Sequence, residues 1–378
     1  MRLRSLLALV LVAAGLTAAT AEGRVAPGVR LVALRAGSEP VSTPFPLSHV
    51  GVQWVGREDA AIEVRTGTPG QFGPWQRLGV AHDLGDEGAG LHLSGLARAD
   101  GATVVQVRAG AGARRVEVVA IDATSAPPPT TAPVVEPAPA PGPPEIVTRA
   151  GWGADEGMRT GVPEYARPQK LVVHHTVTPN DDPDPASTVR AVYAYHTRQN
   201  GWNDIGYHYL VDAAGRVYEG RFARPYAPGE APTEEDHEGR AVIGAHAKSH
   251  NVGSMGVALL GEFSGDAQPS PAAMDSLVRL LAWKADRHGI DPHGSDPFTR
   301  TDGSQVAFPN LAGHRDLVPT GCPGGRLYDR LPEVRDRVAA AVQRVPAPPP
   351  PLPPPPPVPL FPGFWTVDAA GRVLARGD

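Results

Sequence analysis

The chain has 378 residues, of which 35 are Lys or Arg and 40 are Asp or Glu, and its formal net charge is -5. This length accommodates two domains plus linkers. Because nucleic-acid-binding proteins usually carry a basic footprint, the acidic balance argues against a nucleic-acid partner.

The first residues have the pattern of a secretory signal peptide. Arg2 and Arg4 precede an apolar run over residues 6–16, and Ala19-Thr20-Ala21 supplies the small residues of a cleavage site. We therefore predict a signal peptide over residues 1–21 and a secreted protein. No later segment approaches about 18 uninterrupted apolar residues, so we predict no transmembrane segment.

Two proline-rich stretches, residues 126–144 and 346–362, have the composition of extended spacers without a core. The segments they separate are residues 22–125, 145–345 and 363–378. Residues 22–125 contain short alternating runs such as HVGVQWVG and ATVVQVRAG, which predict a small all-β domain, and both a binding role and a spacer role are open for it. The short tail repeats the string VDAAGRV from residues 211–217 and predicts a β-hairpin-like unit.

The segment 145–345 mixes strand and helix patterns. The elements expected in chain order are a strand over 171–177, a helix over 186–200, a hairpin over 207–221, a strand over 254–263, a helix from 271 to about 289 and a last helix from 332 to about 345. This order predicts an α/β fold, with a central mixed β-sheet flanked by helices.

Three residues of this segment form a candidate metal site. His174 lies inside an apolar strand, and His314 and Cys322 lie eight residues apart in a Gly- and Pro-rich loop. Two imidazoles and one thiolate suit zinc, and three protein ligands leave a fourth position for water. Cys322 is the only cysteine, and a buried apolar cysteine would explain it equally well. With 13 histidines in the chain, the residue types alone leave both interpretations open.

The order of several motifs adds a resemblance. The motifs are WGA (152–154), LVVHHTVTP (171–179), DIGYHYLVDAAGRVYEGR (204–221), IGAHAKSHNVGSMGVALLGEF (243–263) and GHRDLVPTGCPG (313–324). Over about residues 145–343 this set resembles the peptidoglycan-recognition-protein and phage-lysozyme-like family of zinc N-acetylmuramoyl-L-alanine amidases. The resemblance implies that Zn²⁺ is bound by His174, His314 and Cys322.

The same resemblance implies roles for further residues. Tyr207 matches the catalytic tyrosine and is expected to donate to the developing oxyanion or to orient the water. Thr320 is expected to assist it, because GVALLG (256–261) lacks the glutamate that other zinc amidases carry there. His246 borders the implied substrate groove, and Trp202 is either a core residue or a sugar-stacking one. The acidic stretch 224–239 is expected to be a solvated loop or a rim of that groove.

The function implied is secreted or wall-associated hydrolysis of the amide between N-acetylmuramic acid and L-alanine in peptidoglycan, by zinc-activated water in a monomer. A non-catalytic peptidoglycan-binding protein is the first alternative, although such relatives typically lack the cysteine. The second is a cysteine hydrolase with Cys322 as nucleophile and His314 as base. The proline after Cys322 and its place in a loop disfavour that chemistry.

Overall fold

The structure is a computed structural model that describes residues 28–81, 90–124, 142–227, 229–343 and 364–376. The predicted signal peptide, the spacer 346–362 and most of the spacer 126–144 lie outside the described residues. The chain divides into two compact units, residues 1–344 and 345–378. Among the described residues, no helix combines the length and apolar character needed to cross a bilayer.

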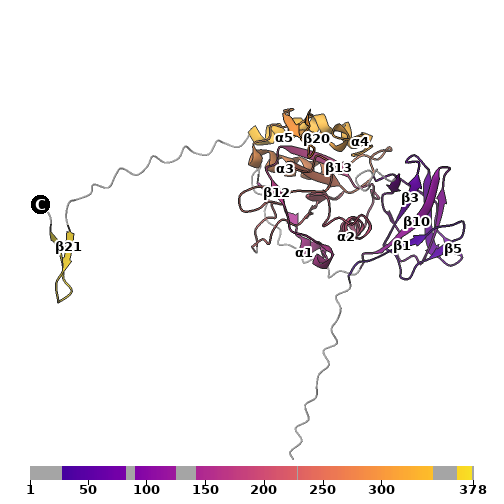
Figure 1. The fold of residues 1–378 in the computed structure, drawn as a ribbon, viewed down its shortest axis with the longest axis horizontal. Coiled ribbons are helices and arrows are strands. Elements are labelled where there is room, and N and C mark those ends of the chain that lie inside the picture. Colours follow the sequence, from indigo (N-terminus) through magenta and orange to yellow (C-terminus); the bar gives the residue numbers. More distant parts are fainter. Residues whose placement is uncertain (1–27, 82–89, 125–141, 228, 344–363, 377–378) are drawn as a thin grey trace, which may run out of the picture. The chain divides into compact units, whose positions relative to one another are not determined.

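The described residues between 30 and 122 form two antiparallel five-stranded sheets (Figure 1), as the alternating pattern predicts. The first sheet contains β1 (Arg30–Arg35), β3 (His49–Gly56), β7 (Leu91–Leu93), β8 (Ala97–Arg98) and β10 (Ala113–Asp122). The second contains β2 (Val41–Ser42), β4 (Ile62–Thr68), β5 (Gln71–Phe72), β6 (Gln76–Leu78) and β9 (Val104–Ala109). Alternate residues such as Val50, Val52 and Trp54 of β3 point into one apolar core, so we call this part the β-sandwich.

The central segment is built on a six-stranded mixed sheet, which confirms the predicted fold class. Its order is β11 (Ile146–Val147), β15 (Val217–Glu219), β14 (Tyr209–Val211), β17 (Ser254–Leu259), β13 (Lys170–His175) and β20 (Leu311–Gly313). The four strands from β14 to β20 run parallel, and the predicted hairpin is the antiparallel β14–β15 pair. Smaller pairs join β12 (Tyr165–Ala166) to β16 (Ala241–Val242) and β18 (Pro297–Thr299) to β19 (Gln305–Ala307).

Helices cover both faces of this sheet (Figure 1). The apolar cluster on one face includes residues of α3 (Pro271–His288) and α5 (Leu331–Gln343), and the cluster on the other includes residues of α1 (Arg149–Trp152) and α2 (Pro185–Ala194). Short turns complete the segment: η2 (Glu156–Met158), η3 (Tyr195–Gln199), η4 (His314–Asp316) and α4 (Gly325–Tyr328). The predicted helix over 186–200 therefore continues from α2 into the π-helical η3.

The predicted helix from 271 has the ends that its sequence specifies. Ser270 accepts a hydrogen bond from the Ala273 N–H as the N-cap, and Pro271 occupies the first turn, where its missing N–H costs nothing. Gly289 ends the helix with a φ of 64°. The last predicted helix begins at Leu331 and ends at Gln343.

The acidic stretch 224–239 is not a solvated loop. Glu235 is fully buried and pairs with Lys284 of α3 at 2.8 Å and with Arg287 at 2.6 Å. Burial opposes ionisation of Glu235, but its contacts with His288, Lys284 and Arg287 outweigh that effect and lower its pKa to about 2. This stretch is therefore held on α3, and none of its described residues lines the groove described below.

The β-sandwich and the central segment share an apolar cluster. Val119 and Ile121 of β10 pack with Val189 and Val192 of α2 in one buried group. His49 contacts the Thr188 hydroxyl at 2.9 Å, with both side chains buried. Burial lowers the pKa of His49 to about 3, so this contact is made by a neutral ring.

Residues 364–376 form a separate small element. Strands β21 (Phe364–Val367) and β22 (Val373–Arg376) pair antiparallel, with Val367 opposite Val373. The predicted hairpin-like tail is thus a two-stranded hairpin.

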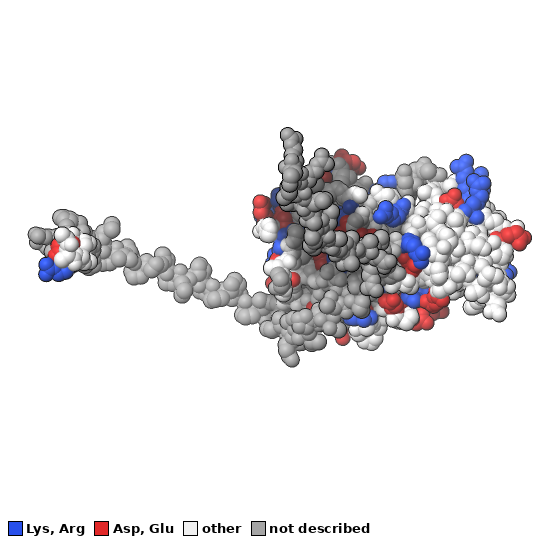
Figure 2. All heavy atoms as spheres, turned by 90° about the horizontal axis from the view of Figure 1, so that it is seen from below, with Lys and Arg blue, Asp and Glu red and all other residues white. Residues whose placement is uncertain are grey.

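On the face of the molecule drawn in Figure 2, acidic and basic side chains are interspersed in small groups.

Candidate metal centre and substrate groove

The sheet register brings the three predicted metal ligands together. Strands β13 and β20 run parallel with Val173 opposite Gly313, so His174 and His314 follow at the same edge of the sheet. Cys322 lies in the loop that returns to α4, and its carbonyl accepts a hydrogen bond from the Arg315 N–H at 3.1 Å. The Thr320 hydroxyl accepts a hydrogen bond from the Cys322 N–H at 3.1 Å, which holds the turn before the cysteine.

The donor atoms of His174, His314 and Cys322 all lie within 4.8 Å of one another, and all three residues are buried. Cys322 Sγ lies 3.6 Å from His174 Nδ1. In a tetrahedral zinc site with bonds of about 2.0–2.3 Å, neighbouring donor atoms are roughly 3.3–3.8 Å apart. The donor types, and the spacing of the Cys322–His174 pair, therefore fit zinc.

A chain of hydrogen bonds behind His174 orients its ring. His174 Nε2 lies 3.0 Å from His246 Nδ1, and His246 Nε2 lies 3.3 Å from Ser254 Oγ. Ser254 Oγ donates to the His250 carbonyl at 2.5 Å, which fixes the direction of the chain. If His174 Nδ1 binds a metal, its Nε2–H donates to His246, and every later contact has one donor and one acceptor. The structure thus places His246 beside a predicted ligand as well as on the groove.

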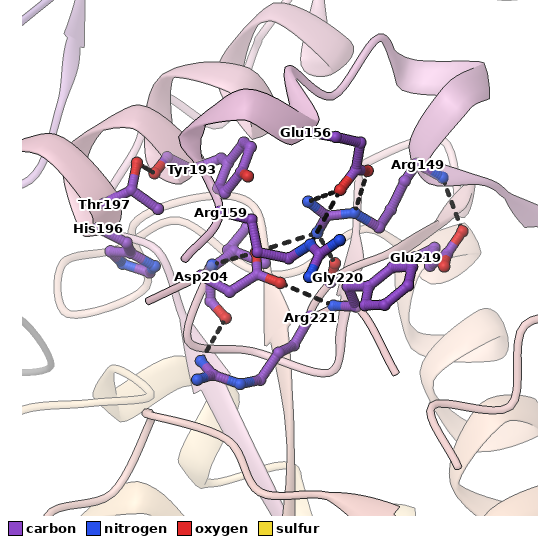
Figure 3. A network of polar contacts seen from close by, with 12 residues as sticks. Arg149, Glu156, Arg159, Tyr193, His196, Thr197, Asp204, Glu219, Gly220 and Arg221 are labelled. Atoms are coloured by element: carbon purple, nitrogen blue, oxygen red, sulfur yellow. Dashed lines mark hydrogen bonds and ion pairs between the residues drawn. The ribbon is translucent and has the colours of Figure 1, made fainter. Parts of the chain in front are cut away.

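Tyr207 is held beside the candidate metal site by the loop that precedes it. Its ring centroid lies 5.3 Å from that of His174, and only 3% of its surface is exposed. The loop is braced by the polar network in Figure 3. There Asp204 accepts from Arg149 Nη1 at 3.1 Å and from the Ile205 N–H at 2.7 Å, and Arg221 donates to the Ile205 carbonyl at 3.0 Å.

A groove of about 620 Å³ reaches the cluster at His314. The central segment contributes Trp202 and His246, both predicted to bind substrate, together with Lys248 and Arg300. The remaining lining residues are Gln53, Leu91, Leu93, Gln199, Asn200, Ala245, Ala247, Ser249, His250, Asn251, Asp302, Leu317, Val318 and Pro319. Trp202 also packs on His196 with a centroid distance of 4.7 Å, so one ring serves the core and the groove wall.

Comparison with known proteins identifies the family. A family model described as N-acetylmuramoyl-L-alanine amidase matches residues 164–325. The peptidoglycan recognition protein of Trichoplusia ni is 30% identical over 190 residues, which cover 49% of this chain and 85% of that protein. The chain belongs to the family of peptidoglycan-recognition proteins and N-acetylmuramoyl-L-alanine amidases.

Other members of this family match the same part of the chain. Peptidoglycan-recognition protein LB of Drosophila melanogaster is 29% identical over 48% of this chain, which spans 66% of that protein. The N-acetylmuramoyl-L-alanine amidase of Homo sapiens is 33% identical over 50% of this chain, which spans 28% of the human protein. The solved structure of Drosophila PGRP-LB covers 50% of this chain and 92% of its own, at 28% identity and a TM-score of 0.37.

Sequence reasoning missed the groove residues that this family member takes from its β-sandwich, namely Gln53, Leu91 and Leu93. One signal was present. Residues 118–121 of β10 read VVAI without alternation, which is typical of a strand buried on both faces, and the structure buries all four. That pattern indicates that something covers the outer face of the sandwich.

The network behind Tyr207 predicts a pH effect on the stability of this amidase-family chain. Burial raises the pKa of Glu219 to about 7, against the opposing hydrogen bond from the Arg149 N–H at 2.7 Å. Between about pH 4.5 and 7 the folded chain therefore keeps a proton that the unfolded chain has lost, so stability falls as pH rises through this window. Glu219→Gln should remove that loss and stabilise the protein at pH 8 by about 2–3 kcal/mol, relative to wild type.

Chemical unfolding of both proteins at pH 4.5 and pH 8 checks this expectation. Glu238→Gln, at a carboxylate whose side chain is 72% exposed, is the matched control and should leave the free energy of unfolding unchanged at both pH values. A Glu219→Gln variant with the same pH dependence as wild type would contradict the assignment.

Proposed function

We propose that this chain is a secreted, zinc-dependent N-acetylmuramoyl-L-alanine amidase. In this proposal residues 145–345 carry the activity and residues 1–21 direct export. One observation carries the proposal. Two imidazoles and a thiol converge within 4.8 Å of one another, beside Tyr207 and at a groove large enough for a muramyl peptide.

The substrate in this proposal is the lactyl amide that joins N-acetylmuramic acid to L-alanine. When bound by His174, His314 and Cys322, zinc would polarise the amide carbonyl and lower the pKa of water toward neutrality. The oxygen of water attacks the carbonyl carbon, the C–N bond breaks, and the nitrogen of L-alanine leaves with a proton. Hydrolysis thus leaves a lactyl carboxylate on the sugar and a free amine on the peptide.

The chain's own residues supply positioning and charge stabilisation. The Tyr207 hydroxyl donates to the carbonyl oxygen as negative charge develops on it, and the burial of Tyr207 limits competition from bulk water for this hydrogen bond. His246 holds the ring of His174 in orientation through their 3.0 Å contact. The contact of Thr320 with the Cys322 N–H supports a role in holding the cysteine rather than a direct part in the chemistry.

The same site also suits a protein that binds peptidoglycan without cutting it, since the family contains recognition proteins as well as amidases. The convergence of Cys322 with both histidines favours catalysis, because a binding protein has no use for an open metal position. A cysteine nucleophile is less well supported, since Cys322 is only 2% exposed and its Sγ lies 3.6 Å from His174 Nδ1.

Product analysis on the full chain tests this function. Purified protein is incubated with peptidoglycan, with and without a chelator, and the released fragments are examined by mass spectrometry. We expect stem peptides with a free L-alanine amine, lost with the chelator and restored by added zinc. Peptidoglycan that is bound but intact would indicate a recognition protein, and cleavage blocked by a thiol reagent but not by the chelator would indicate a cysteine hydrolase.

A further inference from the structure

The β-sandwich contributes part of the groove that leads to the candidate metal site of His174, His314 and Cys322. Leu91 and Leu93 of β7 and Gln53 of β3 line the same groove as His314 and Trp202. Gln53 also makes a polar contact between the sandwich and the central segment, because its side-chain oxygen accepts a hydrogen bond from Gln199 Nε2 at 2.5 Å. Its side-chain nitrogen donates to Glu117 within the sandwich. The sandwich is thus continuous with the wall that the central segment provides.

The contact between the two parts is too close for a loosely tethered module. A Cβ atom on Gly95 would lie 2.0 Å from the Val177 carbonyl oxygen, so only glycine permits this backbone approach. Leu93 and Leu96 pack with Val192 and Tyr195 in a buried apolar cluster, and Arg98 pairs with Asp182 at 3.0 Å. Dry packing with complementary charges holds the sandwich as a fixed wall of the groove.

Two groups of groove-lining residues differ in charge. Lys248, Arg300 and Asp302 belong to a charged group, in which Arg300 donates to His250 Nε2 at 2.9 Å and His250 Nδ1 lies 2.8 Å from the Lys248 carbonyl. The group at the sandwich consists of uncharged residues: Gln53, Leu91, Leu93, Gln199, Asn200 and Trp202. Amides beside apolar and aromatic surface can bind a neutral ligand that carries hydroxyl and acetamido groups.

We propose that the β-sandwich is part of the substrate site and contacts the glycan strand of peptidoglycan beyond the muramic acid residue that is cut. The inference rests on the proposed function, because it assumes that peptidoglycan occupies the groove. The N-acetylated sugars of the strand carry no formal charge, whereas the stem peptide carries carboxylates. The uncharged wall built by the sandwich therefore fits the glycan, and the charged group fits the peptide. Because the glycan strand would extend along this wall, we expect a ligand with several sugars to bind more tightly than a muramyl peptide with one sugar.

The test compares two ligands on full-length protein. One ligand is a muramyl peptide with a single sugar, and the other is a tetrasaccharide that carries the same peptide. All proteins carry Tyr207→Phe, which is expected to keep the bound zinc and to slow hydrolysis about 10²–10³-fold, so that neither ligand is consumed appreciably during the measurement. Leu91→Ala should raise the Kd of the tetrasaccharide ligand about fivefold more than that of the single-sugar ligand, because Leu91 is partly exposed on the groove wall.

Leu34→Ala is the matched control. Leu34 is a partly buried leucine of β1, at the opposite edge of the same sheet from β7, and should change neither Kd. Thermal unfolding of each variant verifies that the fold persists, and Gln53→Ala, at a second site on the wall, should repeat the selective loss. Equal effects of Leu91→Ala on both ligands, or none, would overturn the inference while leaving the proposed function intact. If neither ligand binds before Leu91 is changed, both proposals fail.

Discussion

Cys322→Ala is expected to lose stoichiometric zinc and at least about 10³-fold in the rate of amide hydrolysis. The thiolate is the one anionic donor of the three, and its Sγ lies 3.6 Å from His174 Nδ1. Without it two imidazoles remain, which is fewer than the three protein ligands of catalytic zinc sites. The lost metal removes several kcal/mol of charge stabilisation in the transition state, and each 1.36 kcal/mol is tenfold in rate.

The control for this prediction is Cys322→Asp, which keeps an anionic donor that zinc accepts. We expect it to recover part of the bound zinc and part of the activity, as measured by metal analysis and by release of L-alanine amines. Thermal unfolding of both variants shows whether the fold is retained. Activity in Cys322→Asp would also exclude a cysteine nucleophile. Full activity in Cys322→Ala would contradict the assignment of the ligand.

Tyr207→Phe is expected to lower kcat by about 10²–10³-fold while bound zinc stays at the wild-type level. Removing one preorganised donor to a developing oxyanion costs about this much in other hydrolases. The Tyr207 ring is fixed beside His174 by the bracing of residues 204–206, so Phe should occupy the same position without the hydroxyl. A loss in kcat without loss of metal is what separates this role from a structural one.

Tyr193→Phe is the matched variant. Tyr193 is also buried and belongs to the network of Figure 3, but its hydroxyl donates to the Asp155 carbonyl at 3.2 Å and its ring packs on Trp152, with centroids 5.8 Å apart, rather than on His174. It should lower stability slightly and leave kcat within about twofold of wild type. Equal kinetic losses in both variants would mean that Tyr207 acts through folding rather than on the substrate.

Much of the fold was predictable, because local signals and burial pointed to the same elements. Ser270, Pro271 and Gly289 mark both ends of α3, and the hairpin turn after Val211 is closed by Asp212, which accepts from the Ala214 and Arg216 N–H groups. The proximity of His174 to His314 was predictable only with the family resemblance. It depends on β13 and β20 being neighbours, which no spacing in the sequence specifies.

Two features could not be predicted, because they depend on contacts between distant segments. The acidic stretch 224–239 has the composition of a solvated loop, yet Glu235 is buried against Lys284. Lys284, which lies among the apolar residues of α3, was the one indication in the sequence that an acidic residue packs against this helix. Likewise, the place of Gln53 and Leu91 on the groove follows from how the sandwich docks on α2, across a proline-rich stretch that suggested separate modules.

The central claim is that one zinc ion, held by His174, His314 and Cys322, makes this chain an amidase. The most direct measurement is a titration of metal-free, full-length protein with zinc, in which the release of L-alanine amines from peptidoglycan is followed. The account predicts no activity without metal, a rise in proportion to added zinc and a break at one zinc per chain. Cleavage by the metal-free protein, or intact peptidoglycan at one bound zinc per chain, would contradict it.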